Sequence, residues 1–212
     1  MRYDLVAFDL YGTLLAIEKL EGALDRVLGG DARALLAEWR KAQIGRTWDL
    51  NRRKVYEPFG EVTARALAQV APHLSPEAMD RACKSWLTVP AHPDAAPALR
   101  GLRAAGIRCA VLSNGTAPMI RSALDAAGLS IDDVRSVDEV RVYKPDPRVY
   151  ALLDQMAPRD RTLFVSSNGW DVDGCKKTGR TVAYVDRGGA APTHAPDLRI
   201  TSLEEVARYA AG

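Results

Sequence analysis

Short apolar runs alternate with segments of helical periodicity along most of the chain. Runs of four to six mostly apolar residues, bounded by glycine or polar residues, predict buried strands at residues 3–8, 107–112, 162–165 and 181–185. A weaker run predicts another short strand at residues 134–137. This alternation of strands with helices favours an α/β fold built on a parallel sheet.

Apolar residues spaced three and four apart predict helices in the second half of the chain. One helix has Pro118 near its start and ends at Gly128, and another starts at Asp146 and Pro147. Their apolar faces consist of Ile120, Ala123, Leu124 and Ala127, and of Val149, Leu152, Leu153 and Met156. A capping-box pattern, a serine at 202 with a glutamate at 205, predicts a last helix over residues 203–210.

Residues 16–91 break the alternation, because only helical periodicity is found there. Four apolar stripes directly after the first strand indicate a helical insert above the sheet. We therefore expect a core made of residues 1–15 and 92–212, and an insert made of residues 16–91. The stripes consist of Ile17, Leu20, Leu24 and Leu28; of Ala32, Leu35, Leu36, Trp39 and Ala42; of Phe59, Val62, Ala66 and Val70; and of Met79, Ala82, Cys83 and Trp86.

Length and composition agree with one globular domain that carries a modest insert. The chain has 212 residues, of which 47% are apolar and 26% charged, and this excludes a disordered or fibrous protein. There are 29 lysines and arginines against 27 acidic residues, a formal net charge of +2. This nearly even balance of charge argues against nucleic acid or an anionic membrane as the partner.

Cysteine usage and the N-terminus bear on the compartment. Cys83, Cys109 and Cys175 form no C-x-x-C pair and are too few for a disulfide framework, so we expect reduced thiols. No stretch approaches 18 uninterrupted apolar residues, and an acidic residue occurs at position 4. We therefore expect neither a signal peptide nor a membrane anchor, and a cytoplasmic protein.

Polar residues with chemical potential follow several of the predicted strands. Asp9 follows the first strand, Ser113 and Asn114 follow the second, and the segment SSNGWD follows the run at 162–165. Lys144 stands just before the helix that begins at Asp146. Ligands of open parallel sheets bind beyond the carboxyl ends of the strands, so these side chains are expected to meet. A carboxylate nucleophile, a hydroxyl group, a cation and a second carboxylate would then share one pocket.

Four segments resemble the four motifs of the haloacid dehalogenase superfamily in order and separation: FDLYGTL, LSNG, VYKPDPRVY and SSNGWD. Tyr11 points to the L-2-haloacid dehalogenase branch, because the phosphatase majority of the superfamily has an aspartate there. The cap sequence Trp39-Arg40 also matches this branch. The resemblance covers almost the whole chain. It implies a Rossmann-like, doubly wound parallel sheet with an inserted all-helical cap domain.

The resemblance implies hydrolytic removal of halide from short L-2-haloalkanoic acids, with inversion at C2. Asp9 is expected to attack the halogen-bearing carbon, and water then hydrolyses the resulting ester at its acyl carbon. Asp171, held by Lys144, Ser166 and Asn168, is expected to deprotonate that water.

Other side chains are expected to assist these two steps. Thr13 would hold Asp9 through a hydrogen bond, and Tyr150 would reach Asp171 or Lys144. Arg40 would stabilise the departing halide. Without the resemblance, the favoured interpretation of Arg40 is a solvated arginine beside a core tryptophan.

The substrate carboxylate is expected to bind Ser113 and the backbone N–H groups of Leu10 and Asn114. An apolar wall for the alkyl group and the halogen is assigned to Tyr11, Ile44, Phe59 and Trp170. The competing interpretation is that Ile44 and Phe59 only fill the cap interior. Lys41 stands where the branch suggests a neutral amide, and we expect its side chain to point into water.

Two other functions compete with dehalogenation. A Mg²⁺-dependent phosphatase of the same superfamily needs a second carboxylate in the fourth motif, but this chain has Ser167 there. Tyr11 also removes the acid that would protonate a leaving alcohol. A catalytically inactive relative that acts as a binding protein is the third possibility. The expectation is no metal, no cofactor and a small 2-haloacid substrate, with water consumed and halide released. Apolar cap faces suggest a possible homodimer.

Overall fold

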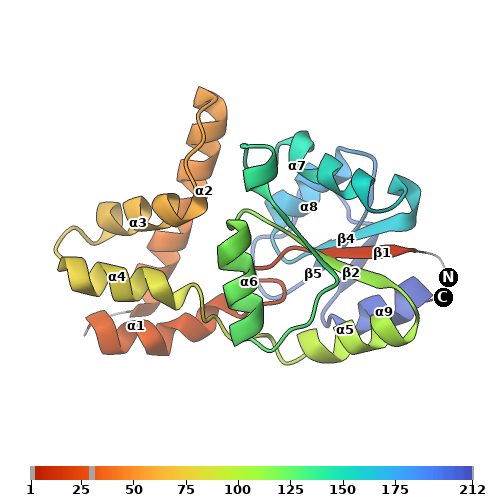
Figure 1. Ribbon diagram of the computed structural model, residues 1–212, viewed down its shortest axis with the longest axis horizontal. Helices are drawn as coiled ribbons and strands as arrows, with labels where there is room; N and C mark the ends of the chain where they lie inside the picture. Colours follow the sequence, from red (N-terminus) through yellow and green to blue (C-terminus); the bar gives the residue numbers. More distant parts are fainter. Residues whose placement is uncertain (1–2, 29–31, 212) are drawn as a thin grey trace.

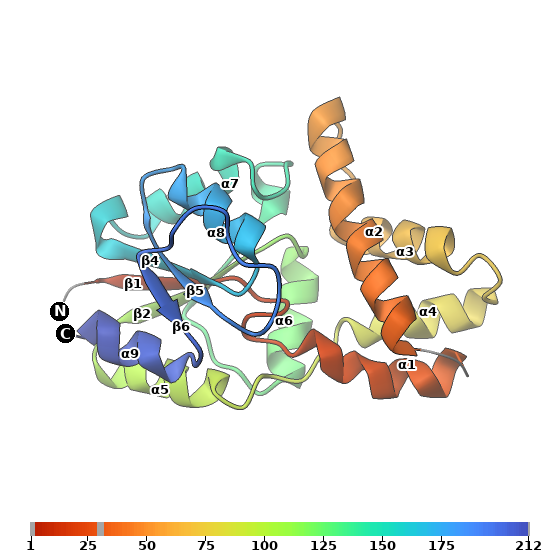
Figure 2. The same cartoon turned by 180° about the vertical axis from the view of Figure 1, so that it is seen from behind.

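The computed structural model describes residues 3–28 and 32–211. It has two lobes, a sheet flanked by helices and a second lobe made only of helices (Figures 1 and 2). The ends of the expected core at residues 1–2 and 212, and residues 29–31 of the expected insert, lie outside the described residues. Among the described residues, no helix has the length and apolar character needed to cross a membrane.

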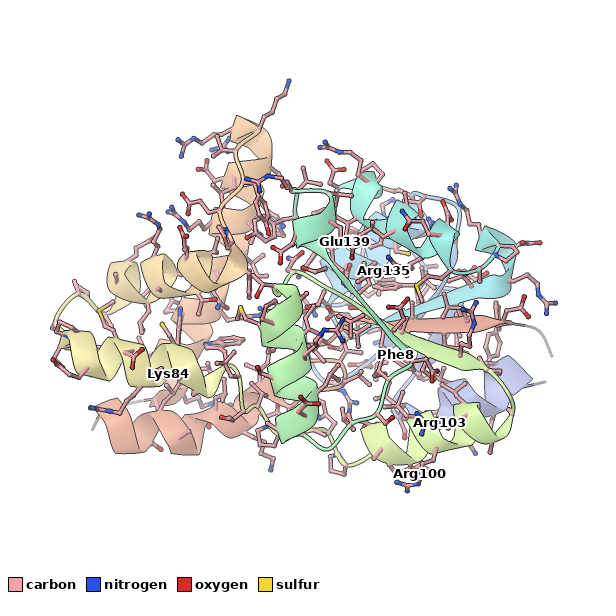
Figure 3. The ribbon with its side chains drawn as sticks, in the orientation of Figure 1. Phe8, Lys84, Arg100, Arg103, Arg135 and Glu139 are labelled. Carbon is pink, nitrogen blue, oxygen red and sulfur yellow. The ribbon has the colours of Figure 1, made fainter. Side chains whose placement is uncertain are left out.

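A six-stranded parallel sheet forms the centre of the larger lobe. Its strands lie in the order β3-β2-β1-β4-β5-β6. All residues of the central strand and of β4 are buried, which explains why these strands appear in the sequence as short apolar runs. Phe8, the last residue of β1, lies inside this core (Figure 3). The strands are β1 (Leu5–Phe8), β2 (Arg108–Ser113), β3 (Asp133–Ser136), β4 (Thr162–Ser166), β5 (Thr181–Val185) and β6 (Leu198–Ile200).

Helices cover both faces of this sheet. On one face, α5 (Ala95–Ala104) packs against α9 (Glu204–Ala211), and on the other α7 (Pro147–Ala151) packs against α8 (Gly169–Lys176) (Figure 1). The helix α6 (Ala117–Ala126) packs on β3 and lies between the sheet and the helical lobe (Figures 1 and 2). This confirms the expected α/β class, a doubly wound, Rossmann-like parallel sheet.

The helical lobe consists of α1 (Glu21–Leu28), α2 (Ala32–Arg53), α3 (Phe59–Val70) and α4 (Pro76–Ser85). Ser75 caps the start of α4, and its side chain accepts the N–H of Ala78 at 3.2 Å. The longest helix, α2, has 22 residues and therefore spans about 33 Å. It packs on α3 and continues well beyond the apolar stripe that predicted it.

Two adjacent segments carry the chain between the lobes. Leu15 and Ala91 form an antiparallel bridge between these segments. Ala16 donates its N–H to the carbonyl oxygen of Pro90 at 2.8 Å, and His92 donates to that of Leu14 at 2.9 Å. The helical lobe is therefore inserted after β1 and tied to the sheet by a paired exit and return.

Local structure departs from the sequence prediction mainly at the ends of elements. The strand expected at residues 134–137 lies at Asp133–Ser136, and the helix expected from Pro147 becomes a 3-10 helix at Leu152–Gln155. A 3-10 turn, Ile17–Leu20, likewise precedes α1. The last helix has its predicted start, because Glu205 accepts the N–H of Ser202 at 3.0 Å. The sequence did not predict β6, whose three residues lie at the edge of the sheet.

Candidate active site

Asp9 is the first residue after the central strand, and three neighbours hold its carboxylate. Thr13 donates to Oδ2 at 3.1 Å and Asn168 Nδ2 donates to the same oxygen at 2.7 Å. Lys144 Nζ donates to Oδ1 at 3.1 Å. The Asp9 side chain is only 9% exposed. Both oxygens are therefore fixed, and the carboxylate is largely shielded from bulk water.

Lys144 bridges the two carboxylates of the site. Its Nζ lies 3.1 Å from Asp9 and 2.8 Å from Asp171, and its side chain is fully buried above the ring of Phe164. Burial alone lowers the pKa of a lysine, but the two carboxylates outweigh burial and raise the pKa of Lys144. The ammonium is therefore charged at neutral pH and offsets part of the negative charge around Asp9.

Asp171 lies in the first turn of α8 and is completely buried. One of its oxygens accepts the ammonium of Lys144, and the other accepts the hydroxyl of Tyr150 at 2.7 Å. Burial raises the pKa of Asp171, Lys144 lowers it, Asp9 raises it, and the overall shift is upward. A carboxylate with a raised pKa is a stronger base, as deprotonation of water requires.

The carboxyl ends of β2 and β4 and the loops that follow them contribute polar groups around Asp9, Lys144 and Asp171. Ser113 Oγ accepts the N–H of Gly115 at 3.1 Å, and Asn114 Oδ1 accepts the backbone N–H of Lys144 at 3.0 Å. Ser166 Oγ accepts the N–H of Asn168 at 3.1 Å. Among the described residues, the backbone N–H groups of Leu10 and Asn114 have no hydrogen-bond acceptor.

Two expected contacts of Asp171 differ in the structure. The amide of Asn168 bonds Asp9 and the carbonyl oxygen of Tyr11, and Ser166 bonds the backbone of Asn168. Within the described part of the chain, neither side chain hydrogen-bonds Asp171. Asn168 is the N-cap of α8 and its amide reaches Asp9, whereas Asp171 lies in the first turn of α8 and is held by Lys144 and Tyr150 instead.

Arg40 reaches the site from the helical lobe. Its guanidinium lies 5.8 Å from the centre of the Trp86 ring and forms no ion pair with a carboxylate of the described residues. Burial lowers the pKa of Arg40, while the nearby charges of Asp9 and Asp171 raise it. Arg40 is therefore partly buried against Trp86, and its assignment to the leaving halide stays a prediction.

The expected apolar residues lie in different surroundings. Tyr11 is buried, donates its hydroxyl to the carbonyl oxygen of Trp86 at 3.1 Å and packs edge-on against that ring. Phe59 is buried and packs against Tyr143 of the core, so it fills the boundary between the lobes. Ile44 is partly buried, and Lys41 is exposed, as expected.

Trp170, half-buried at the start of α8, packs edge-on against Trp48 of the helical lobe, with the ring centres 6.1 Å apart. Three contributors to the site carry no recognisable sequence signal: Trp86, Trp48 and Gly174. A Cβ atom on Gly174 would lie 2.4 Å from Pro145 Cβ and 2.7 Å from the Tyr150 hydroxyl. Only the folded chain brings such residues together.

A family model for haloacid dehalogenase-like hydrolases matches residues 3–179. The chain belongs to this family. The (S)-2-haloacid dehalogenase of Pseudomonas sp. strain YL is 36% identical to this chain, over 95% of this chain and 91% of its own length. Another, (S)-2-haloacid dehalogenase H-109 of Pseudomonas putida, is 37% identical over 87% of this chain and 86% of its own.

Solved structures of the same family agree. The L-2-haloacid dehalogenase of Xanthobacter autotrophicus, solved with chloropropionic acid covalently bound, superposes with a TM-score of 0.93 at 30% identity, covering 99% of both chains. This haloacid dehalogenase-like hydrolase therefore falls into the L-2-haloacid dehalogenase branch, as Tyr11 indicated. It is an enzyme of the class that hydrolyses carbon–halide bonds.

Proposed function

We propose that the enzyme hydrolyses short (S)-2-haloalkanoic acids, the L enantiomers, to 2-hydroxy acids with inversion at C2. The observation that carries this proposal is the Lys144 ammonium between Asp9 and Asp171. We assign the Asp9 carboxylate as the nucleophile and the buried Asp171 carboxylate, whose pKa is raised, as the base. Such a pair suits a reaction with a nucleophilic step followed by a hydrolytic step.

In the first step, an oxygen of Asp9 attacks C2 of the substrate opposite the halogen. The new C–O bond forms as the carbon–halogen bond breaks, and the halide leaves with its electron pair. The product is an ester between Asp9 and the substrate, inverted at C2. We assign stabilisation of the leaving halide to Arg40; this is supported by its positive charge, its place against Trp86 and the lack of an ion pair with a carboxylate of the described residues.

In the second step, water attacks the acyl carbon of the Asp9 ester, and its proton passes to Asp171. The bond between the acyl carbon and the ester oxygen then breaks, and the departing oxygen takes the second proton of the water, so that the product leaves as the 2-hydroxy acid. Asp9 regains a carboxylate with one oxygen from water, and Asp171 releases its proton to solvent. Lys144 contacts both carboxylates, so it stabilises the oxyanion that forms at Asp9. Tyr150 holds the base in place, and Thr13 and Asn168 hold the nucleophile.

The substrate carboxylate is assigned to the backbone N–H groups of Leu10 and Asn114, together with Ser113. These two N–H groups have no acceptor among the described residues and lie just beyond the carboxyl ends of the neighbouring strands β1 and β2. Peptide N–H groups at such strand ends bind anions well. We assign the alkyl group and halogen to contacts with Tyr11, Ile44 and Trp170, and not with Phe59, which packs on Tyr143.

We further propose that the reaction needs no metal or other cofactor. The described residues contain no group of three or more His, Cys, Asp or Glu side chains arranged to hold a metal ion. The Ser167 hydroxyl stands in the fourth motif and is engaged with the Gly12 carbonyl oxygen at 2.7 Å. A hydroxyl in that position is a poor Mg²⁺ ligand compared with a carboxylate.

Halide release from each enantiomer of 2-chloropropionate, in excess EDTA, tests this proposal. We expect release from the L enantiomer alone, abolished by Asp9→Asn and retained in Asp160→Asn, whose carboxylate is exposed on the core. A single turnover in ¹⁸O-labelled water should place the label in Asp9. No release from either enantiomer, with hydrolysis of a phosphate ester in Mg²⁺, would instead establish a phosphatase.

Three wider assignments are also proposals. Residues 1–15 and 92–212 form the catalytic core and residues 16–91 the cap, which supplies Arg40. The cytoplasm suits three free cysteines. A homodimer through the cap is also proposed, from the exposed apolar side chain of Val55, which is 46% exposed. Sedimentation of wild type and Val55→Lys would test the dimer.

A further inference from the structure

One side chain of the helical lobe holds the backbone just before Lys144. Asn51, near the end of α2, donates from Nδ2 to the carbonyl oxygen of Tyr143 at 2.7 Å, and its Oδ1 accepts the N–H of Tyr143 at 2.9 Å. Figure 1 shows this end of α2 beside the segment that follows β3. Both backbone groups of one core residue are thus paired with a single side chain of the other lobe.

The clamped residue leads directly into the site. Lys144 follows Tyr143, and its own backbone N–H is held by Asn114 at 3.0 Å. From this fixed backbone the side chain extends to Asp9 and Asp171. Because a lysine side chain is long and flexible, the place of its ammonium depends on the backbone from which it starts. Asn51 fixes one side of that backbone and Asn114 fixes the other.

The same face of α2 also carries Arg40. Arg40 and Asn51 are 11 residues apart, which is about 20° from three full turns of a helix and about 16 Å along its axis. The helix therefore contacts the site at one point through Arg40 and the support of Lys144 at another through Asn51. Docking of α2 on the core would therefore position both Arg40 and Lys144.

We propose that Asn51 is a positioning residue, which couples docking of the helical lobe to the placement of Lys144 between Asp9 and Asp171. This inference rests on the proposed function, since it assigns Asn51 to the machinery of that reaction. Asn51 contacts backbone atoms of Tyr143 and acts on the reacting groups only through Lys144.

Tyr143 makes a second contact with the helical lobe, and this contact offers a matched comparison for Asn51. The Tyr143 hydroxyl donates to the carbonyl oxygen of Glu57 in the helical lobe at 2.5 Å. Tyr143→Phe removes this bond between the lobes but leaves the Asn51 pair intact. If Asn51 only attaches the lobes to each other, Asn51→Ala and Tyr143→Phe should act alike. Arg53→Ala, an exposed change on the same helix, serves as the control that leaves activity unchanged.

The acid limb of the pH–rate profile separates these roles, because it follows the ionisation of Asp171. Asp171 interacts electrostatically with five titratable or charged groups: Lys144, Asp9, Tyr150, Arg40 and Cys175. When Lys144 is displaced, its lowering effect on the pKa of Asp171 is lost, while burial and Asp9 still raise that pKa. The acid limb then moves to higher pH.

The experiment measures kcat, KM and the pH–rate profile with L-2-chloropropionate. For Asn51→Ala we expect a kcat roughly 10- to 100-fold lower and an acid limb at higher pH. For Tyr143→Phe we expect a higher KM and an unmoved limb. If Asn51→Ala does not fold, Asn51→Ser, which replaces at most one of the two bonds, should show a smaller shift of the same sign.

The inference is overturned if the Asn51 variants change only KM, as Tyr143→Phe does, or change nothing. Carboxyl ¹³C titration of Asp171 in wild type and Asn51→Ala gives a readout that requires no turnover. A higher pKa of Asp171 in the variant supports the inference, and an unchanged pKa refutes it. Failure of the wild type to release halide would overturn the proposed function instead, so the two failures are distinguishable.

Discussion

Gly174 offers a sharp test of how closely the site is packed. It lies on α8, one turn after Asp171. A Cβ atom there would lie 2.4 Å from Pro145 Cβ and 2.7 Å from the Tyr150 hydroxyl, with Pro145 Cα at 3.2 Å. Carbon atoms pack at about 3.5 Å or more, so Gly174→Ala must move Pro145 by about 1 Å. Pro145 follows Lys144, and Tyr150 holds Asp171, so both supports of the base would shift.

The magnitude follows from two opposing effects. Alanine is favoured over glycine within a helix by about 1 kcal/mol, while overpacking of a rigid core costs about 1–3 kcal/mol. Gly45 provides the matched control, because it lies within α2 and a Cβ there meets nothing within 4 Å. The helix term is the same in Gly174→Ala and Gly45→Ala. The free energies of unfolding of the two variants should therefore differ by about 1–3 kcal/mol, which is the steric cost alone.

Thermal unfolding and halide release measure these effects. For a chain of this size, the difference corresponds to a Tm about 2–12 °C lower for Gly174→Ala than for Gly45→Ala. We also expect kcat to fall roughly 10- to 100-fold in Gly174→Ala only, because displacement by about 1 Å misplaces the base. If both variants are stabilised equally and retain wild-type kcat, the steric argument is refuted.

Further predictions concern the buried base and its partners. Since the pKa of Asp171 is raised and its ionised form is required, kcat should fall on acidification at a pH above the ordinary aspartate pKa of about 3.9, and a profile flat to pH 4 would contradict this. Tyr150→Phe removes a hydrogen bond to the ionised carboxylate, so kcat should drop about tenfold or more and the acid limb should move to higher pH. Lys144→Met leaves two buried carboxylates unpaired and should lower the free energy of unfolding at pH 7 by about 3–5 kcal/mol in urea titrations. This loss should shrink as the pH falls and Asp171 takes up a proton, whereas a loss independent of pH would argue against the charge explanation.

The sequence alone determined the larger features of this protein. Strands buried on both faces must be continuous apolar runs, so β1, β2, β4 and β5 could be located from hydrophobicity. The carboxyl ends of parallel strands lie along one edge, so Asp9, Ser113 and the fourth motif were expected to meet there. The contacts of Thr13 with Asp9 and of Tyr150 with Asp171 were also anticipated from the motifs.

Which side chains touch depends on the three-dimensional packing of the segments. The sequence placed Asn168 with Asp171, but the fold places its amide on Asp9, because the cap of α8 lies beside β1. The roles of Asn51 and Gly174 depend on partners 92 residues away in one case and on the space left by a missing Cβ atom in the other. Periodicity and motifs report what each segment buries or presents. Ångström-scale contacts between segments arise from how the two lobes dock, which no local pattern encodes.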